Sequence, residues 1–186
     1  LLGYSNGGIV AFDMARQLLE QGEKITSLVL LDTLSPQCLG RDPVENTMVE
    51  VFNRLVSMMG KHSDLNVAEL AQISPEQRGS FFHQRVTELG IVLPKKQFIT
   101  TLTVALENEL ACRAYQPEKL SQAVNPLLIR ATQGYVDMPP DYGWSALFCD
   151  TLKHDDIPAS HFTLLEKDYI KDVVKIMNKA ARYSVR

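Results

Sequence analysis

A serine lies between two glycines near the start of the sequence, in Gly3-Tyr4-Ser5-Asn6-Gly7. This G-x-S-x-G pattern is typical of a tight strand-to-helix turn that raises a nucleophilic hydroxyl above a sheet. We expect a Cβ at Gly3 or Gly7 to clash with the neighbouring strand or helix, because such a turn is crowded on both sides of the serine. A five-residue match also fits an ordinary glycine-rich turn, so the surrounding elements must decide.

A serine hydroxyl is a weak nucleophile that needs a base, and the base needs a carboxylate to orient it. Asp32 directly follows the apolar segment 28–31, and His161 follows the last predicted strand. Both positions are at the carboxyl ends of strands, where open α/β sheets bind their ligands. The pattern therefore predicts Ser5 as nucleophile, His161 as base and Asp32 as orienting acid, although Asp32 could also cap a turn before Pro36.

The remaining histidines and the cysteines fit structural positions better. His154 lies within a strand pattern, and His62 and His83 lie in a helical region, which is typical of surface or packing residues. The chain has three cysteines, an odd number, and no two of them have C-x-x-C spacing. This favours reduced thiols over a disulfide or zinc framework, and we expect no metal site.

Alternating strand and helix patterns position the candidate residues. An apolar stripe from Ile9 to Leu19 predicts a helix that ends at Gly22, and a strand follows over 25–31. Strand patterns then disappear until about residue 116. Helices are expected at 45–59, 75–89, 94–115 and 168–182, and further strands at 126–131 and 151–157. The chain thus reads as an α/β core, 1–35 and 117–186, interrupted by a helical insertion, 36–116.

Composition narrows the class of protein. The chain has 186 residues, of which 45% are hydrophobic and 22% charged, as is typical of a globular domain. Its net charge of -3 argues against a nucleic-acid partner. No apolar run approaches the roughly 18 residues of a membrane span. The start also lacks the pattern of a secretory signal, so a cytoplasmic location is expected.

The sequence resembles the thioesterase domains of nonribosomal peptide and polyketide synthases. These domains belong to the α/β-hydrolase superfamily and are related to the fatty-acid synthase thioesterase. The matching segments are Gly3 to Gly8 with Val10 to Ala15, Leu28 to Asp32, Gly143-Trp144, and His161 to Leu165. The resemblance implies an α/β-hydrolase fold, a mostly parallel sheet flanked by helices, with a helical lid over the serine. It also implies the order Ser5, Asp32, His161 for the triad.

The same resemblance implies an oxyanion hole that uses the backbone N–H of Asn6 and a second N–H from an earlier loop. The family's first strands and that loop would precede Leu1, so we expect them to be missing from this chain. In most α/β-hydrolases the acid follows the next strand, which here leads to Asp137. Asp137 is therefore the alternative acid, and its ordinary explanation is a loop aspartate before two prolines.

The implied substrate is an acyl, polyketide or peptidyl chain bound as a thioester to the phosphopantetheine arm of a carrier protein, with no other cofactor. Release by water would give an acid, and release by an internal hydroxyl or amine would give a macrocycle. Side chains that could line a chamber for this chain, or simply pack the lid, are Tyr4, Phe52, Met58, Met59, Phe81, Phe82 and Phe98.

Two other functions fit the same residues. A stand-alone type II editing thioesterase or a small-ester hydrolase would keep the triad but cleave short acyl chains. A catalytically inactive domain on the same scaffold would only bind a partner, although the coexistence of Ser5, Asp32 and His161 speaks against it.

Overall fold

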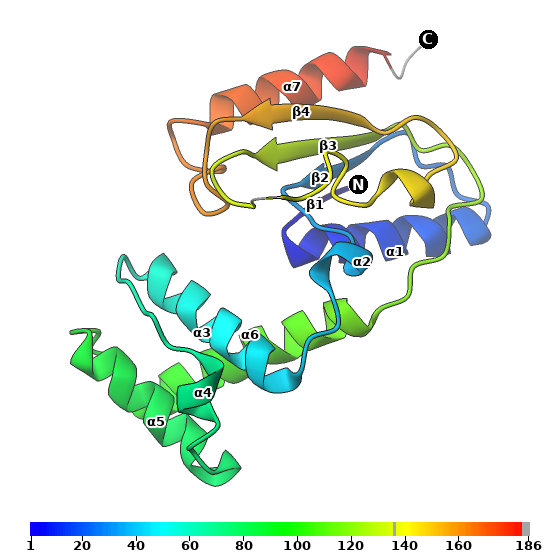
Figure 1. The fold of residues 1–186 in the computed structure, drawn as a ribbon. Helices are drawn as coiled ribbons and strands as arrows, with labels where there is room; N and C mark the ends of the chain where they lie inside the picture. The colour runs from blue at the N-terminus through cyan, green and yellow to red at the C-terminus, as the bar shows by residue number, and fades with distance from the viewer. Residues whose placement is uncertain (136, 184–186) are drawn as a thin grey trace. The chain divides into compact units, whose positions relative to one another are not determined.

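The computed structural model describes residues 1–135 and 137–183. The chain divides into two compact units, the first formed by Leu1–Gly40 with Tyr115–Arg186 and the second by Arg41–Ala114 (Figure 1). The first unit contains a sheet with helices, and the second is helical. Among the described helices, none is both long and apolar enough to cross a membrane.

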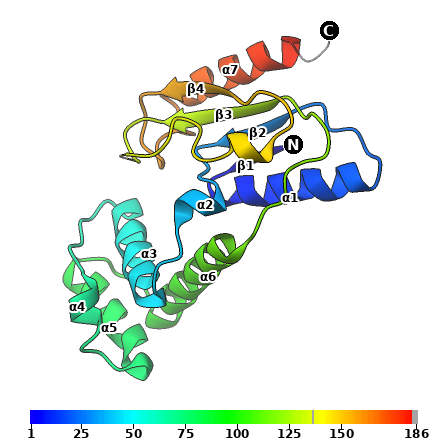
Figure 2. The same cartoon turned by 45° about the vertical axis from the view of Figure 1, so that its right-hand side comes forward.

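In the described residues, four parallel strands form the sheet of the first unit in chain order: β1 (Leu2–Tyr4), β2 (Leu28–Leu31), β3 (Pro126–Ala131) and β4 (Lys153–Ile157). Every residue of β2 is buried, as expected for a parallel strand covered on both faces. Helices α1 (Asn6–Glu20) and α7 (Ile170–Tyr183) lie on opposite sides of the sheet (Figures 1 and 2). This arrangement brings the carboxyl ends of all four strands to one edge.

Helix α1 buries part of its predicted apolar stripe, since Val10 is 58% and Met14 47% exposed. Phe12 and Ala15 have no exposed surface, and Leu19 is also buried. The ring of Phe12 packs against Trp144, with centroids 5.1 Å apart. The chain leaves the helix through Gly22, whose φ of 82° lies in the left-handed region that glycine adopts at no steric cost. Helix α1 therefore packs through Phe12, Ala15 and Leu19, which belong to the stripe that the periodicity indicated.

The second unit contains α3 (Val44–Met58), α4 (Val67–Leu70), α5 (Pro75–Glu88) and α6 (Lys95–Ala114). The three long helices confirm the predicted ones to within one residue at each end. Helix α4 and, in the first unit, α2 (Pro36–Leu39) were not predicted, because each is a single turn. Both begin at a side-chain cap, with Asn66 accepting from the backbone of Glu69 and Ser35 from that of Cys38.

A buried ion network lies in the second unit beside its apolar core. The Glu109 side chain is 2% exposed and contacts Arg54 at 2.7 Å and Arg113 at 3.2 Å. Arg113 also contacts Asp42 at 3.1 Å and Glu50 at 2.5 Å. The network therefore joins the start of the unit to the end of α6.

Candidate active site

Two neighbouring strand ends position Ser5 and Asp32. Tyr4 pairs with Leu31 in the sheet register, so Ser5 and Asp32 each come one residue after a matched pair. The Ser5 N–H donates a hydrogen bond to the carbonyl of Leu31 at 2.9 Å, which extends the ladder into the turn. Both residues have a positive φ, 55° for Ser5 and 43° for Asp32. Such backbone strain costs about 1 kcal/mol or more per residue and is found mainly at functional sites.

Thr33 anchors the turn that carries Ser5. Its hydroxyl lies 2.9 Å from the carbonyl oxygen of Ser5 and 3.1 Å from that of Leu31. The indole N–H of Trp144, which has no exposed surface, donates to the carbonyl of Thr33 at 2.7 Å. The serine turn is thus tied to the segment after β2 and to a buried tryptophan.

Only one of the two motif glycines is required sterically. A Cβ on Gly3 would lie 2.1 Å from the carbonyl oxygen of Gly7, which is well inside van der Waals contact. A Cβ on Gly7 would meet nothing within 4 Å, so the expected clash at this position is wrong. Gly8, outside the motif, takes its place, because a Cβ there would lie 2.1 Å from the hydroxyl of Thr33. The first turn of α1 is therefore crowded against β1 and against Thr33, which follows β2.

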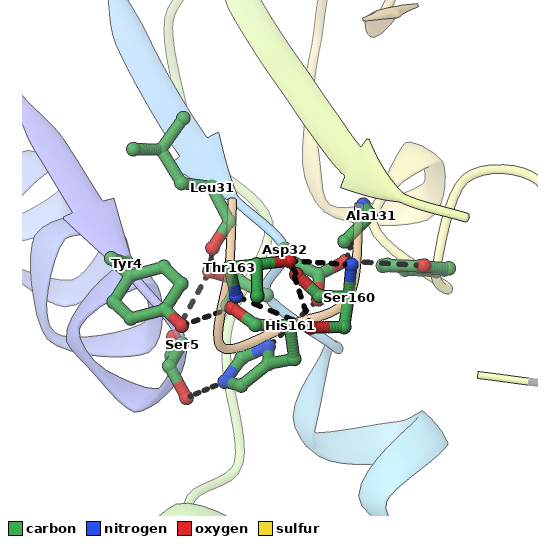
Figure 3. Close-up of polar contacts among 10 residues, drawn as sticks. Tyr4, Ser5, Leu31, Asp32, Ala131, Ser160, His161 and Thr163 are labelled. Atoms are coloured by element: carbon green, nitrogen blue, oxygen red, sulfur yellow. Dashed lines mark hydrogen bonds and ion pairs between the residues drawn. The ribbon is translucent and has the colours of Figure 1, made fainter. Parts of the chain in front are cut away.

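His161 lies in the loop after β4, between Ser5 and Asp32. Its Nε2 is 3.0 Å from the Ser5 hydroxyl, and its Nδ1 is 2.7 Å from Oδ2 of Asp32 (Figure 3). The imidazole is 13% exposed and the Asp32 carboxylate is fully buried. These distances are those of a serine nucleophile linked to a base and of that base linked to an orienting acid.

The buried carboxylate of Asp32 has donors on both oxygens. Oδ1 accepts from the backbone N–H of Ala131 at 2.9 Å and from the phenol of Tyr142 at 3.2 Å, while Oδ2 faces His161. Burial, followed by the charge of Asp32, raises the pKa of Tyr142, so its phenol remains a proton donor at neutral pH. Tyr142 is not among the predicted site residues, although it adjoins the Gly143-Trp144 pair.

Three aromatic rings surround the His161 imidazole. Tyr4 stacks on it with centroids 4.9 Å apart and an interplanar angle of 21°. Phe162 and Tyr135 meet it edge-on at 5.4 and 6.0 Å. The Tyr4 phenol also donates a hydrogen bond to the backbone carbonyl of His161 (Figure 3). Tyr4, expected among the chamber residues, therefore contacts the histidine through its ring and its hydroxyl.

The rival residues lie elsewhere. Asp137 is exposed to solvent, and within residues 1–135 and 137–183 it is Asp32 that contacts the imidazole of His161. His62 and His154 are exposed, and His83 contacts the carbonyl of Leu93 at 2.9 Å. In the described ranges, no group of three or more His, Cys, Asp or Glu residues is arranged to hold a metal ion.

Several chamber candidates are core residues of the helical unit. Phe52 and Phe98 have no exposed surface, and Phe82 is 1% exposed. The ring centroids of Phe52 and Phe82 are 4.9 Å apart. A ligand cannot reach such side chains, so the structure corrects the chamber expectation for these three. Phe81 and Met59 are half-buried and Met58 is 61% exposed, which leaves these three accessible.

Asn6 is the first residue of α1, directly after Ser5. A helix N-terminus carries a partial positive charge, and the first turn of α1 contains no acidic residue. The environment of the Asn6 amide therefore favours a negative charge that develops beside Ser5.

Comparison with known proteins identifies a family for this chain. Residues 1–181 match the family described as Thioesterase domain. The non-reducing polyketide synthase ntnG of Nectria sp is 21% identical over 180 residues, which are 96% of this chain and 9% of that protein. The conidial pigment polyketide synthase alb1 of Aspergillus fumigatus is 46% identical over 54 residues, which are 28% of this chain and 2% of that protein. The chain thus spans less than a tenth of these curated relatives.

Solved structures share the fold. A four-domain nonribosomal peptide synthetase, holo-AB3403, matches with a TM-score of 0.79 at 23% identity, over 96% of this chain and 14% of that one. The NocB thioesterase domain, solved as a covalent complex with a fluorophosphonate nocardicin G analogue, matches with a TM-score of 0.65 at 19% identity, over 96% of this chain and 63% of that one. With its matched family, its parallel sheet and its serine turn, the chain belongs to the Thioesterase domain family.

Proposed function

We propose that this domain releases an acyl or polyketide chain from a carrier protein by cleaving its thioester through an acyl-enzyme on Ser5. The observation that carries the proposal is the continuous chain of contacts from the Ser5 hydroxyl to His161 at 3.0 Å and from His161 to Asp32 at 2.7 Å. The polyketide synthases among its relatives support a chain bound to a phosphopantetheine arm.

In the first half-reaction, Oγ of Ser5 attacks the thioester carbonyl carbon while Nε2 of His161 takes its proton. Asp32 accepts from Nδ1–H and stabilises the imidazolium that forms. The negative carbonyl oxygen of the tetrahedral intermediate lies against the N–H of Asn6 at the positive end of α1. The intermediate then expels the thiol of the phosphopantetheine arm, which receives the proton from His161.

In the second half-reaction the acyl-enzyme is cleaved by an oxygen or nitrogen nucleophile. His161 takes a proton from water, or from a hydroxyl or amine of the chain itself, and later returns it to Ser5. Water gives a free acid, and an internal nucleophile gives a macrocycle. Both products follow from the same three residues, so the shape of the chamber must select between them.

Labelling with a fluorophosphonate probe tests the nucleophile. We expect the full protein to be labelled at Ser5 and the Ser5→Ala variant to remain unlabelled and to lose about 10⁶-fold in kcat. A correctly folded protein that does not react with the probe would instead support the inactive binding scaffold.

A substrate comparison tests the assembly-line function. We expect an acyl thioester on a carrier protein to have a higher kcat/KM than a short aryl ester. A preference for the aryl ester would point to a small-ester hydrolase, and a preference for short acyl groups on many carriers would point to an editing thioesterase.

A further inference from the structure

We propose that Tyr4 is a positioning residue that sets the place of His161 relative to Ser5. The inference rests on the proposed function, because it assigns Tyr4 a part in the same serine chemistry. Tyr4 makes two different contacts to His161, one to its ring and one to its backbone. Together they restrain both the side chain and the main chain of the base.

The first contact fixes the plane of the imidazole. The two rings are nearly parallel, with an angle of 21° and centroids 4.9 Å apart, as in offset stacking. The hydrogen bonds of Nδ1 and Nε2 orient the imidazole within its own plane, toward Asp32 and Ser5. A ring against its face resists the remaining tilt, which would otherwise carry Nε2 away from the serine.

The second contact fixes the backbone of the base. The Tyr4 phenol donates to the main-chain carbonyl of His161, from a residue 157 positions earlier. Burial, followed by the negative charge of Asp32, raises the pKa of Tyr4, so the phenol keeps its proton at neutral pH. The hydrogen bond is therefore present over the whole range in which a histidine base works.

The topology explains why such a tie is needed. Ser5 follows β1 and His161 follows β4, and these strands lie at opposite ends of the strand order, three spacings or about 14 Å apart. The loop that carries His161 is closed by hydrogen bonds between Ser160 and Thr163. Those bonds give the loop its shape but do not set its distance from the serine.

Tyr4 can set the distance between the His161 loop and the serine because it is bonded covalently to Ser5. The residue that touches the base from β1 is the one directly before the nucleophile. Phe162 also touches the imidazole, but it adjoins His161 in sequence and moves with it, and it is 36% exposed. Tyr4 is thus placed to transmit the position of the nucleophile to the base.

The test compares two variants at Tyr4 with a matched tyrosine. Tyr4→Phe keeps the stacked ring and removes the phenol, and Tyr4→Leu removes both contacts. Tyr115→Phe is the control, because the Tyr115 phenol also bonds to a distant side chain, Asp13 at 2.6 Å, but touches none of the triad. Each variant is assayed in the full protein with an acyl N-acetylcysteamine thioester, and kcat is divided by the sites counted by end-point fluorophosphonate labelling.

We expect Tyr4→Phe to lower kcat about 10-fold and Tyr4→Leu about 100-fold, with KM changed by less than about twofold, because misplacing a reacting group by about 1 Å costs about 100-fold. Both half-reactions use His161, so kcat falls whichever of them limits the rate. Tyr115→Phe should keep kcat within about twofold of the wild type.

Three results would overturn the inference. A raised KM with an unchanged kcat would make Tyr4 a substrate contact. If Tyr4→Phe had the same kcat per labelled site as the wild type, the phenol would have no role in positioning His161. A similar loss in Tyr115→Phe would reduce the effect to general packing. If Tyr4→Leu yields no labelled sites, Tyr4→Phe alone decides. Full activity of Ser5→Ala would instead refute the proposed function itself.

Discussion

The phenol of Tyr142 donates a hydrogen bond to Oδ1 of Asp32 over 3.2 Å, from 110 residues further along the chain. The Tyr142 ring lies under the guanidinium of Arg130, which is 5.6 Å from its centroid. Arg130 is in turn held by Asp156 through contacts of 2.7 and 2.6 Å. The candidate acid is thus supported by an aromatic side chain that an ion pair between β3 and β4 holds in place.

Removing the Tyr142 phenol should weaken this support. We expect Tyr142→Phe to lower the free energy of unfolding by about 1 kcal/mol, the net contribution of one hydrogen bond. A loss of about 1 kcal/mol in transition-state stabilisation corresponds to roughly fivefold in kcat. Chemical denaturation and steady-state kinetics measure the two effects. Wild-type values for both would show that the N–H of Ala131 alone suffices to hold Asp32.

The choice between the two candidate acids can be tested by paired substitutions. Asp32→Asn should lower kcat about 10⁴-fold, because the amide cannot stabilise the imidazolium and favours the wrong tautomer of His161. Asp137→Asn should leave kcat unchanged, since Asp137 is exposed. Turnover by the same thioester assay measures both variants. The reverse pattern would mean that the acid is Asp137.

The two motif glycines should respond oppositely to alanine. Gly3→Ala forces a methyl group to within 2.1 Å of a backbone oxygen, and we expect it to destabilise the domain by about 3 kcal/mol. Gly7→Ala meets nothing within 4 Å and lies in α1, where alanine gains about 0.5 to 1 kcal/mol over glycine. Thermal unfolding distinguishes them. Equal destabilisation by both would contradict the one-sided crowding at the turn.

The ion network of the helical unit should make its stability depend on acid pH. Burial raises the pKa of Glu109, but the hydrogen bonds and charges of Arg54 and Arg113 outweigh it and hold the pKa below its ordinary value of 4.5. A lowered pKa stabilises the folded state above the pKa of the unfolded chain, and this stabilisation is lost as the pH falls through the folded value.

Replacing Glu109 by Gln should therefore flatten the loss of stability between about pH 5 and pH 3. Denaturation midpoints across this range measure the slope, and Glu107→Gln, at an exposed site on the same helix, serves as the control. An unchanged slope in Glu109→Gln, or an equal change in Glu107→Gln, would exclude the network as the cause.

Local pattern was sufficient for most of the elements. Strand β3 was predicted to the residue from its apolar run, and Asn125 directly before it has a φ of 44°. Strand β2 begins at Leu28 and not at residue 25, since Leu28 pairs with Pro126, the first residue of β3. The start of a strand depends on its partner, and sequence periodicity does not contain that information.

The candidate site was predictable in its residues but not in its supports. Their positions after predicted strands placed Ser5, Asp32 and His161 at one edge, with Asp137 as the alternative acid, and the structure adds the contact of Asp32 with His161. Apolar periodicity could not tell a core residue such as Phe52 from a chamber residue, because both recur on one face of a helix. The contact of Tyr4 with His161 depends on a loop conformation that no local pattern encodes.

The hydrogen bond from the Ser5 amide to the carbonyl of Leu31 has a mechanical consequence. Ser5 and Asp32 each come one residue after the paired residues Tyr4 and Leu31. A shift of either strand end therefore moves the Ser5 hydroxyl and the Asp32 carboxylate together. The two strand ends therefore move together, and the loop that carries His161 follows them through its contacts with Tyr4, Ser5 and Asp32.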